Sequence, residues 1–317
     1  MTLQIAVIDD WQGVAGDVVD WSVLEVIGQV SFLHDYHAAT EIMAERLAGF
    51  DVICVMRERS TFDETLLRQL PRLKLLVTGG MRNAALDIQA ATALGIPVCG
   101  TQSYKHAAPE LTWALIMALS RNLLKEANAL RAGDWQQGLG GDLYGKTLGI
   151  LGLGSIGQKV ARYGQAFGMR VIAWSENLTP ERAAESGVEY VGKQALFEQA
   201  DLLSIHLVLS DRSRGLVDVQ ALGWMKPSAL LINTARGPIV DEQALIHALE
   251  NGKLAGAALD VYEQEPLPNN HPLRTLGNVL ATPHIGYVSE NNYRMFYSQM
   301  IEDIQAWAAG QPIRRLG

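Results

Sequence analysis

The 317 residues carry a net charge of −8 at pH 7 and contain no long basic run, which argues against broad attraction to nucleic acid or to an anionic membrane. The chain is longer than one hydrophobic core usually grows, and its 48% apolar and 19% charged residues are ordinary for a globular protein, so we expect two folded domains. Residues 1–10 lack the basic and apolar segments of a signal peptide, and no run approaches the roughly 18 apolar residues of a membrane span, so neither export nor membrane insertion is expected.

Two cysteines, Cys54 and Cys99, lie inside apolar segments that are expected to be strands. Buried, reduced thiols explain them better than a disulfide framework, which favours the cytoplasm. The histidines share no spacing with cysteines or carboxylates that would indicate a metal site, so no catalytic metal is expected.

Short apolar runs alternate with helix-like stretches through the first third of the chain. The expected strands are residues 3–8, 30–33, 52–56, 73–77 and 96–99. Helical spacing over residues 40–47 and 63–70 lies between some of these runs, and this alternation predicts βαβ units with a parallel sheet. An amphipathic stretch over residues 109–132 then predicts one long helix that leads out of the first domain.

A second alternating series follows a glycine-rich connection at residues 138–142. Its expected strands are residues 148–151, 171–174, 202–206, 230–233, 255–259 and 279–281. A last helix is expected over residues 288–309, packed back on an earlier domain, with no further strand after it.

A glycine-rich run connects the strand at 148–151 to a helical stretch at 158–167. In this context glycines allow a tight turn, close approach to a pyrophosphate, and tight packing of helix on strand, while the helix N-terminus offers N–H groups. A glycine-rich turn without a ligand is the less favoured alternative. The predicted contacts with NAD, or with NADP, which is not excluded, are Gly152, Gly154, Ser155, Ile156 and Gly157.

The ribose of that cofactor is expected beside Ser175 and Glu176, at the end of the strand at 171–174. An acidic residue at this place accepts hydrogen bonds from the ribose hydroxyls and repels a 2′-phosphate. Glu176 stands one position later than usual, and neither residues 175–177 nor the loop after them carries a basic residue. We therefore predict weak discrimination between NAD and NADP, the alternative being a plain polar loop.

Three polar side chains follow strands of the second series, namely Arg236, Glu265 and His284. The carboxyl ends of parallel strands meet at one edge of a sheet, so we expect the three to converge. A protonated imidazole neutralises the charge that an arriving hydride leaves on a keto oxygen, and a carboxylate beside it favours that imidazolium. A guanidinium matches a substrate carboxylate. Each residue taken singly has a structural explanation, but the set predicts carbonyl reduction.

Several motifs occur in the order in which the D-isomer-specific 2-hydroxyacid dehydrogenases carry them, and the sequence resembles that family over nearly its whole length. They are residues 133–135, 145–149, 233–237, 260–266 and 282–286, besides the glycine run. The resemblance implies an NAD(P)-dependent oxidoreductase of small 2-keto or 2-hydroxy acids, specific for the D-isomer. It also implies that Arg236 binds substrate, that Glu265 is the partner of the histidine, and that His284 is the acid/base.

The same resemblance implies a fold of two doubly wound parallel α/β domains with a cleft between them. A flavodoxin-like substrate domain would hold residues 1–100 plus 286–317, and a Rossmann cofactor domain residues 101–285. The expected partners are a 2-keto or 2-hydroxy acid and a second copy of the chain in a homodimer, with no nucleic acid and no membrane. The further expected cofactor contacts are Thr112, His206, Thr234, Ala235 and Asp260.

The first domain is expected to supply the other half of the substrate site. The loop at residues 77–83 follows a strand, and in the family this loop presents backbone N–H groups to the substrate carboxylate. Arg82 and Asn83 stand where a small and an aromatic residue are common, and Arg57 and Arg59 follow a neighbouring strand. This pattern favours an anionic or strongly polar substrate, and the alternative for each arginine is a solvated loop charge. The predicted substrate contacts are Arg57, Gly80, Met81, Arg82 and Arg236.

Two other functions fit part of the pattern. A nucleotide-sensing binding protein, similar to the corepressors that resemble this family, would keep the cofactor site and act through protein partners. The presence of Arg236, Glu265 and His284 together argues against it. A formate-type dehydrogenase would carry glutamine where Glu265 stands. Reduction of a 2-keto acid is therefore the predicted function.

Overall fold

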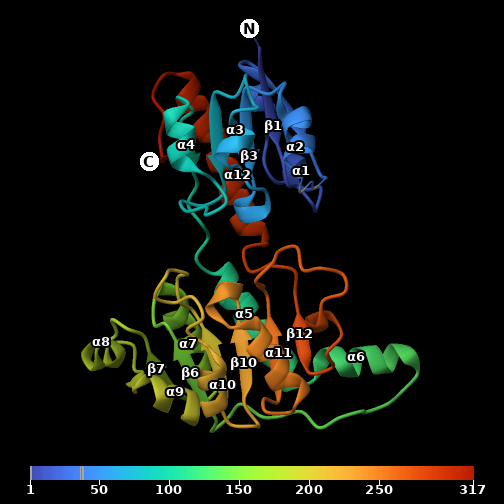
Figure 1. The fold of residues 1–317 in the computed structure, drawn as a ribbon, viewed down its shortest axis with the longest axis vertical. Helices are drawn as coiled ribbons and strands as arrows, with labels where there is room; N and C mark the ends of the chain where they lie inside the picture. Colours follow the sequence, from blue (N-terminus) through green and yellow to red (C-terminus); the bar gives the residue numbers. More distant parts are fainter. Residues whose placement is uncertain (1, 36, 38) are drawn as a thin grey trace. The chain divides into compact units, whose positions relative to one another are not determined.

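The computed structural model describes residues 2–35, 37 and 39–317, and the chain divides into two compact units (Figure 1). One unit holds Met1–Tyr104 together with Val288–Gly317, and the other holds Lys105–Tyr287. Each unit is built on its own sheet, with helices packed against it. The two-domain, parallel-sheet α/β fold class that the sequence predicts is confirmed.

The first unit is a six-stranded sheet in the order β13-β5-β4-β3-β1-β2. Its strands are β1 (Leu3–Val7), β2 (Gly28–Phe32), β3 (Val52–Val55), β4 (Leu75–Thr78), β5 (Val98–Gly100) and β13 (Arg315–Leu316). Its α-helices are α1 (Ala15–Val18), α2 (Thr40–Leu47), α3 (Glu64–Leu67), α4 (Ile88–Ala93) and α12 (Glu290–Ala308). The central strands β3 and β4 are buried along their whole length and apolar except for Thr78 at the end of β4, as a parallel sheet covered on both faces requires.

The expectation that no strand follows the last helix is wrong. β13 lies beyond α12 and pairs antiparallel with β5 at the edge of the first sheet. The strand is two residues long and carries no alternating pattern of its own. It forms because α12 returns the chain to this edge, where Arg314 binds the buried carboxylate of Asp303, with 3.0 Å between Nε and Oδ1.

The second unit is a seven-stranded parallel sheet in the order β12-β11-β10-β9-β6-β7-β8. Its strands are β6 (Thr147–Leu151), β7 (Arg170–Trp174), β8 (Glu189–Tyr190), β9 (Leu202–Ile205), β10 (Leu230–Asn233), β11 (Gly256–Leu259) and β12 (Val279–Ala281). Its α-helices are α5 (Ala107–Ser120), α6 (Leu123–Ala132), α7 (Ser155–Ala166), α8 (Pro180–Ala184), α9 (Lys193–Gln199), α10 (Val219–Trp224) and α11 (Glu242–Glu250).

The register of this second sheet determines where its functional residues lie. The last residues of β6, β9, β10, β11 and β12 pair with one another across the sheet. The residues that come directly after these strands therefore lie along a single edge. They are Gly152, His206, Thr234, Asp260 and Thr282. The order of strands changes direction at β6, which is where open α/β sheets bind nucleotides.

The expected single helix over residues 109–132 is wrong, because the structure has two helices, α5 and α6. Asn122 separates them with a left-handed φ of 52°, a conformation that asparagine adopts more readily than most residues. Its side-chain amide donates a hydrogen bond to the carbonyl of Leu139, at 3.2 Å. The apolar spacing continues across the break, so the pattern alone predicts one helix.

No helix among the residues that the structure describes has both the length and the apolar character needed to cross a membrane. Cys54 and Cys99 are buried free thiols.

Candidate active site

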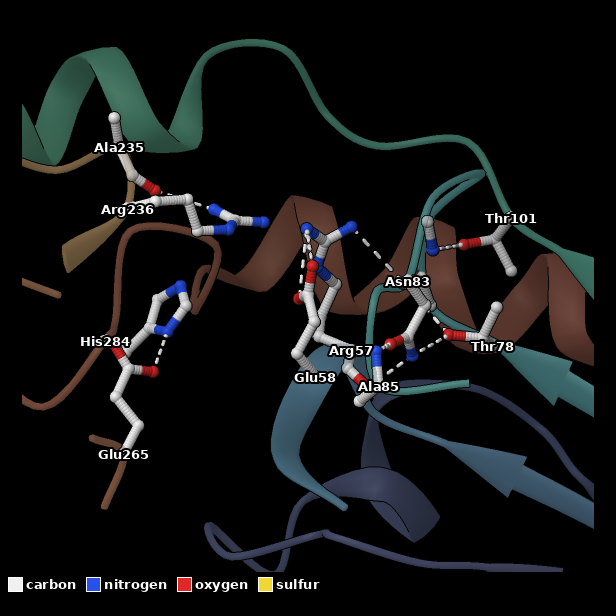
Figure 2. A network of polar contacts seen from close by, with 12 residues as sticks. Arg57, Glu58, Thr78, Asn83, Ala85, Thr101, Ala235, Arg236, Glu265 and His284 are labelled. Carbon is white, nitrogen blue, oxygen red and sulfur yellow. Dashed lines mark hydrogen bonds and ion pairs between the residues drawn. The ribbon is translucent and has the colours of Figure 1, made fainter. Parts of the chain in front are cut away.

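His284 and Glu265 form the closest polar pair at the carboxyl edge of the second sheet. Nδ1 of His284 lies 2.5 Å from Oε2 of Glu265, and both side chains are partly exposed, at 21% and 34%. Figure 2 shows the imidazole turned toward the carboxylate, and the ring of Tyr287 meets it edge to face, 5.5 Å away between centroids. A carboxylate at Nδ1 fixes which ring nitrogen carries the proton. The arrangement leaves Nε2 as the nitrogen available to a ligand.

The turn that carries His284 is held by the buried carboxylate of Asp260. His284 has a left-handed φ of 52°, and its N–H donates to the carbonyl of Thr282. Asp260 accepts hydrogen bonds from the N–H groups of Ile285 and Gly286, at 2.8 and 2.7 Å, and from the hydroxyl of Thr282 at 2.6 Å. Burial raises the pKa of Asp260, and these hydrogen bonds together with nearby His284 partly offset that effect. Asp260 therefore fixes the backbone that presents His284.

Arg236 lies in a loop closed by the side chain of Asn233. The Asn233 amide donates to the carbonyl of Arg236 at 3.0 Å and accepts from the N–H of Ala235 at 3.0 Å. The guanidinium donates to the carbonyl of Ala235 at 2.7 Å, as Figure 2 shows. The position of Arg236 thus depends on Asn233, a residue of the same motif for which the sequence alone predicts no role.

Tyr262 connects the three loops that carry Arg236, Glu265 and His284, and sequence reasoning missed it. Its N–H donates to Oε1 of Glu265 at 2.9 Å, and its buried hydroxyl donates to the carbonyl of Thr282 at 2.8 Å. A Cβ at Gly237 would lie 2.0 Å from the carbonyl of Tyr262, so only glycine permits this contact. The signal was present in the sequence as a glycine next to Arg236 and an aromatic residue before Glu265.

The glycine-rich run leaves open space where a pyrophosphate is expected. Gly152 has a φ of 104°, and a Cβ there would lie 2.9 Å from the backbone of His206. A Cβ at Gly157 would lie 2.2 Å from the carbonyl oxygen of Gly152, whereas one at Gly154 would meet nothing within 4 Å. α7 begins at Ser155, so N–H groups of its first turn face this space. Ser155 and Ile156 are exposed, and the run fits a dinucleotide.

The other residues expected at the cofactor lie along the same edge. Thr112 is fully buried on α5, where its hydroxyl bonds to the carbonyl of Ala108 at 2.8 Å and to the hydroxyl of Thr234 at 2.7 Å. Nε2 of His206 lies 2.8 Å from the hydroxyl of Ser204. Desolvation lowers the pKa of His206 to about 3, so this histidine is neutral near pH 7 and unsuited to donating a proton.

In the first unit, Arg57 and the loop after β4 form a second polar cluster (Figure 2). Arg57 has a left-handed φ of 58°, its side chain is 16% exposed, and its guanidinium lies 3.3 Å from Glu58. A Cβ at Gly80 would lie 2.0 Å from Nη1 of Arg57, the end of a flexible side chain, and the φ of 94° at this residue favours glycine in any case. The N–H of Gly80 donates to the hydroxyl of Thr101 at 2.8 Å.

Asn83 anchors the loop after β4, which gives a structural reason for an asparagine where an aromatic residue is common in the family. Its side-chain amide donates to the carbonyl of Arg57 at 2.6 Å and to the hydroxyl of Thr78 at 2.9 Å, and its oxygen accepts from the N–H of Ala85. Met81 and Arg82 are exposed at the loop's tip, and within the described residues their backbone N–H groups donate no hydrogen bond. The loop therefore has two N–H donors, those of Met81 and Arg82, and the guanidinium of Arg82 that a ligand could bind.

Arg59 is not a solvated loop charge. Its guanidinium stacks on Trp11, 4.4 Å from the ring centroid, and donates to the carbonyl of Asp9 and to the hydroxyl of Tyr293. Arg59 thus fixes the loop after β1 to α12.

In the part of the chain that the structure describes, no three histidine, cysteine or carboxylate side chains lie close enough to hold a metal ion.

Residues 113–286 match the family model described as D-isomer specific 2-hydroxyacid dehydrogenase, NAD binding domain. A glyoxylate reductase of Aeropyrum pernix is 41% identical over 259 residues, which cover 78% of this chain and 77% of that protein. A glyoxylate reductase of Thermococcus litoralis is 37% identical and covers 85% and 84%. The crystal structure of phosphoglycerate oxidoreductase from Vibrio cholerae o395 is similar with a TM-score of 0.94 and 38% identity, covering 98% of this chain and all of that one.

Proposed function

The chain belongs to the D-isomer-specific 2-hydroxyacid dehydrogenases, and on that premise we propose that His284, Glu265 and Arg236 carry out its reaction. The family that the motifs predict is confirmed, as is the function of an oxidoreductase that exchanges a hydride between NAD(P) and a small 2-keto or 2-hydroxy acid. A sensor without turnover is not favoured. The contact of 2.5 Å between His284 and Glu265 is the observation that supports the roles proposed here.

His284 is the acid in reduction and the base in oxidation. The bound nicotinamide supplies or accepts the hydride. As charge develops on the keto oxygen, the imidazole donates its Nε2 proton to it, and the carboxylate of Glu265 stabilises the imidazolium through Nδ1. In oxidation the same nitrogen takes the hydroxyl proton. Asp260 and Tyr262 hold the ring and the carboxylate in place through the contacts of their own loops.

The substrate carboxylate binds to Arg236 from the second unit and to the loop of Gly80, Met81 and Arg82 from the first. A guanidinium forms two parallel hydrogen bonds with a carboxylate, and free backbone N–H groups add further donors. Arg57 contributes positive charge beside Gly80. In this proposal residues 1–100 plus 286–317 are the substrate domain, and residues 101–285 are the cofactor domain.

Oxidation of NADH and NADPH with a panel of carbonyl compounds tests this function. Glyoxylate is the first keto acid to test, because several relatives are named glyoxylate reductase. D-3-phosphoglycerate is tested in the oxidative direction, because other relatives are named D-3-phosphoglycerate dehydrogenase. We expect turnover with a 2-keto acid and a D-configured product where the product is chiral. Pyruvate compared with acetaldehyde is the matched control, since only pyruvate offers a carboxylate to Arg236. Binding of NADH without turnover of any acid would contradict the proposal.

The protein is further proposed to form a homodimer through α6 and the segment after it. Residues of α6 are not buried, although three leucines line it, and Trp135 and Leu139 are 74% and 96% exposed. Figure 1 shows α6 extending away from the sheet of its own unit. A helix of this length is marginal in water unless it packs on something, and an exposed apolar surface of this kind marks an interface.

Replacing Leu123 and Leu130 with glutamate is expected to weaken association by about 10²-fold or more, because the dimer would bury unpaired carboxylates. Sedimentation velocity over a range of protein concentrations measures the effect. Val219→Glu, on an exposed valine of α10 in the same unit, is the matched control and should leave the dimer intact. A monomeric wild-type protein would contradict the proposal.

A cytoplasmic location is proposed on the basis of Cys54 and Cys99, which are free and buried and thus suited to a reducing compartment.

A further inference from the structure

The turn after β7 lies beside the glycine-rich run. The N–H of Gly152 donates to the carbonyl of Trp174, the last residue of β7, at 2.9 Å. Ser175 follows directly, and its carbonyl accepts from the N–H of Leu178 at 3.0 Å, which closes a turn anchored by the buried Leu178 side chain. In nucleotide-binding sheets of this type the adenosine ribose lies at the end of this strand. Whatever side chains surround Ser175 therefore determine how the 2′ position of the cofactor is recognised.

Arg182 reaches this turn from the short helix that follows it. Thr179 caps α8, with its hydroxyl accepting from the N–H of Arg182, and Pro180 occupies the first turn. Nη1 of Arg182 lies 3.3 Å from the carbonyl of Asn177, so the side chain contacts the turn that begins at Ser175. The sequence prediction considered only basic residues inside the loop. It missed Arg182 because this residue lies outside the loop in sequence, and only the geometry of α8 brings its side chain to the carbonyl of Asn177.

The charge of Arg182 is not neutralised by an acidic partner. None of the ion pairs within the described residues involves Arg182, and its side chain is exposed. Arg170, the first residue of β7, differs from Arg182 in this respect, because two of its nitrogens lie 2.7 and 2.9 Å from the carboxylate of Glu189. The loop thus holds one available guanidinium, while Ser175 contributes a hydroxyl at the position where a carboxylate would repel phosphate.

We propose that Ser175 and Arg182 form a binding site for the 2′-phosphate of NADPH, so that the protein uses NADPH as well as NADH. Arginine forms strong, often bidentate, hydrogen bonds with phosphate, and the serine hydroxyl can donate a further one. Glu176, exposed on the same turn, accepts hydrogen bonds from the free ribose hydroxyls of NADH when the phosphate is absent. This inference rests on the cofactor site of the proposed function and not on the roles of Arg236, Glu265 or His284.

Two probes that differ only in the 2′-phosphate test the site without turnover. Adenosine 2′,5′-bisphosphate and AMP are titrated into the full-length protein by calorimetry. Arg182→Ala is expected to weaken binding of the bisphosphate by about tenfold or more and to leave AMP within about twofold, as loss of a charge-assisted hydrogen bond predicts. Arg182→Lys should retain part of the affinity. Arg170→Ala, which removes a paired arginine of the same domain, is the matched control and should change neither titration.

Cofactor kinetics provide the second readout. With the preferred keto acid, Arg182→Ala should lower kcat/KM for NADPH by about tenfold and leave kcat/KM for NADH unchanged. Equal losses for both probes, or no loss for the bisphosphate, would overturn the assignment of Arg182. A wild-type protein that binds the bisphosphate no more tightly than AMP would overturn the site altogether. Because the titrations need no turnover, they test the 2′-phosphate site even if the proposed catalytic roles prove wrong.

Discussion

Replacing His284 with alanine or glutamine is expected to lower kcat by about 10²-fold or more, because general acid catalysis typically contributes that much. The hydride still arrives at the keto carbon in such a variant, but no positioned proton meets the charge that forms on oxygen. The affinity for NADH should remain within about twofold, since the glycine-rich run and the turn after β7 do not include His284. Steady-state kinetics and fluorescence titration of NADH measure the two quantities.

His247→Ala is the matched control for this experiment. His247 is an exposed histidine on α11 in the same unit and belongs to neither proposed site. Its replacement should leave kcat unchanged. If His284→Ala retains the kcat of the wild type, His284 has no part in proton transfer, and the proposed function loses its acid. A loss of NADH affinity together with kcat would instead indicate that the turn held by Asp260 had moved, which thermal unfolding of the variant would help to identify.

Replacing Arg236 with alanine is expected to lower kcat/KM for the keto acid by about 10²-fold, mainly through a higher KM, because a charge-assisted pair with the substrate carboxylate is lost. Arg236→Lys should recover little of this loss, since an ammonium cannot form two parallel hydrogen bonds with a carboxylate. Steady-state kinetics with a 2-keto acid and with an aldehyde that lacks a carboxylate separate the causes. The loss should be large for the keto acid and small for the aldehyde.

Full recovery of kcat/KM by lysine would exclude the bidentate role of Arg236. An equal loss for the keto acid and the aldehyde would show that the arginine acts on loop structure and not on the carboxylate. That second outcome is physically reasonable, since the backbone of Arg236 accepts a hydrogen bond from Asn233 and Gly237 packs against Tyr262. Arg236→Lys keeps those backbone contacts, so the pair of variants distinguishes the two causes.

The sequence by itself determined the fold class, the family and the strands that carry the site. Strands such as β4 and β10 are short and apolar up to their last residue because both faces of a parallel sheet are covered, and this produces a pattern that depends on local composition alone. The residues after such strands are then placed by the register of the sheet. For this reason the sequence predicts that Arg236, Glu265 and His284 act together, and His284 and Glu265 lie in direct contact.

Only the tertiary structure decided features that depend on contacts between distant segments. The chain breaks between α5 and α6 where Asn122 takes a left-handed conformation and its amide bonds to Leu139. β13 exists because α12 brings residues 315–316 beside β5. The contacts of Tyr262 with three separate loops have no sequence pattern of their own. Arg182 is a surface residue of α8 by its spacing, and it reaches the turn after β7 because of a side-chain direction. Local periodicity indicates which residues of a helix or strand are buried. Contacts between distant segments depend instead on how the helices and strands pack together.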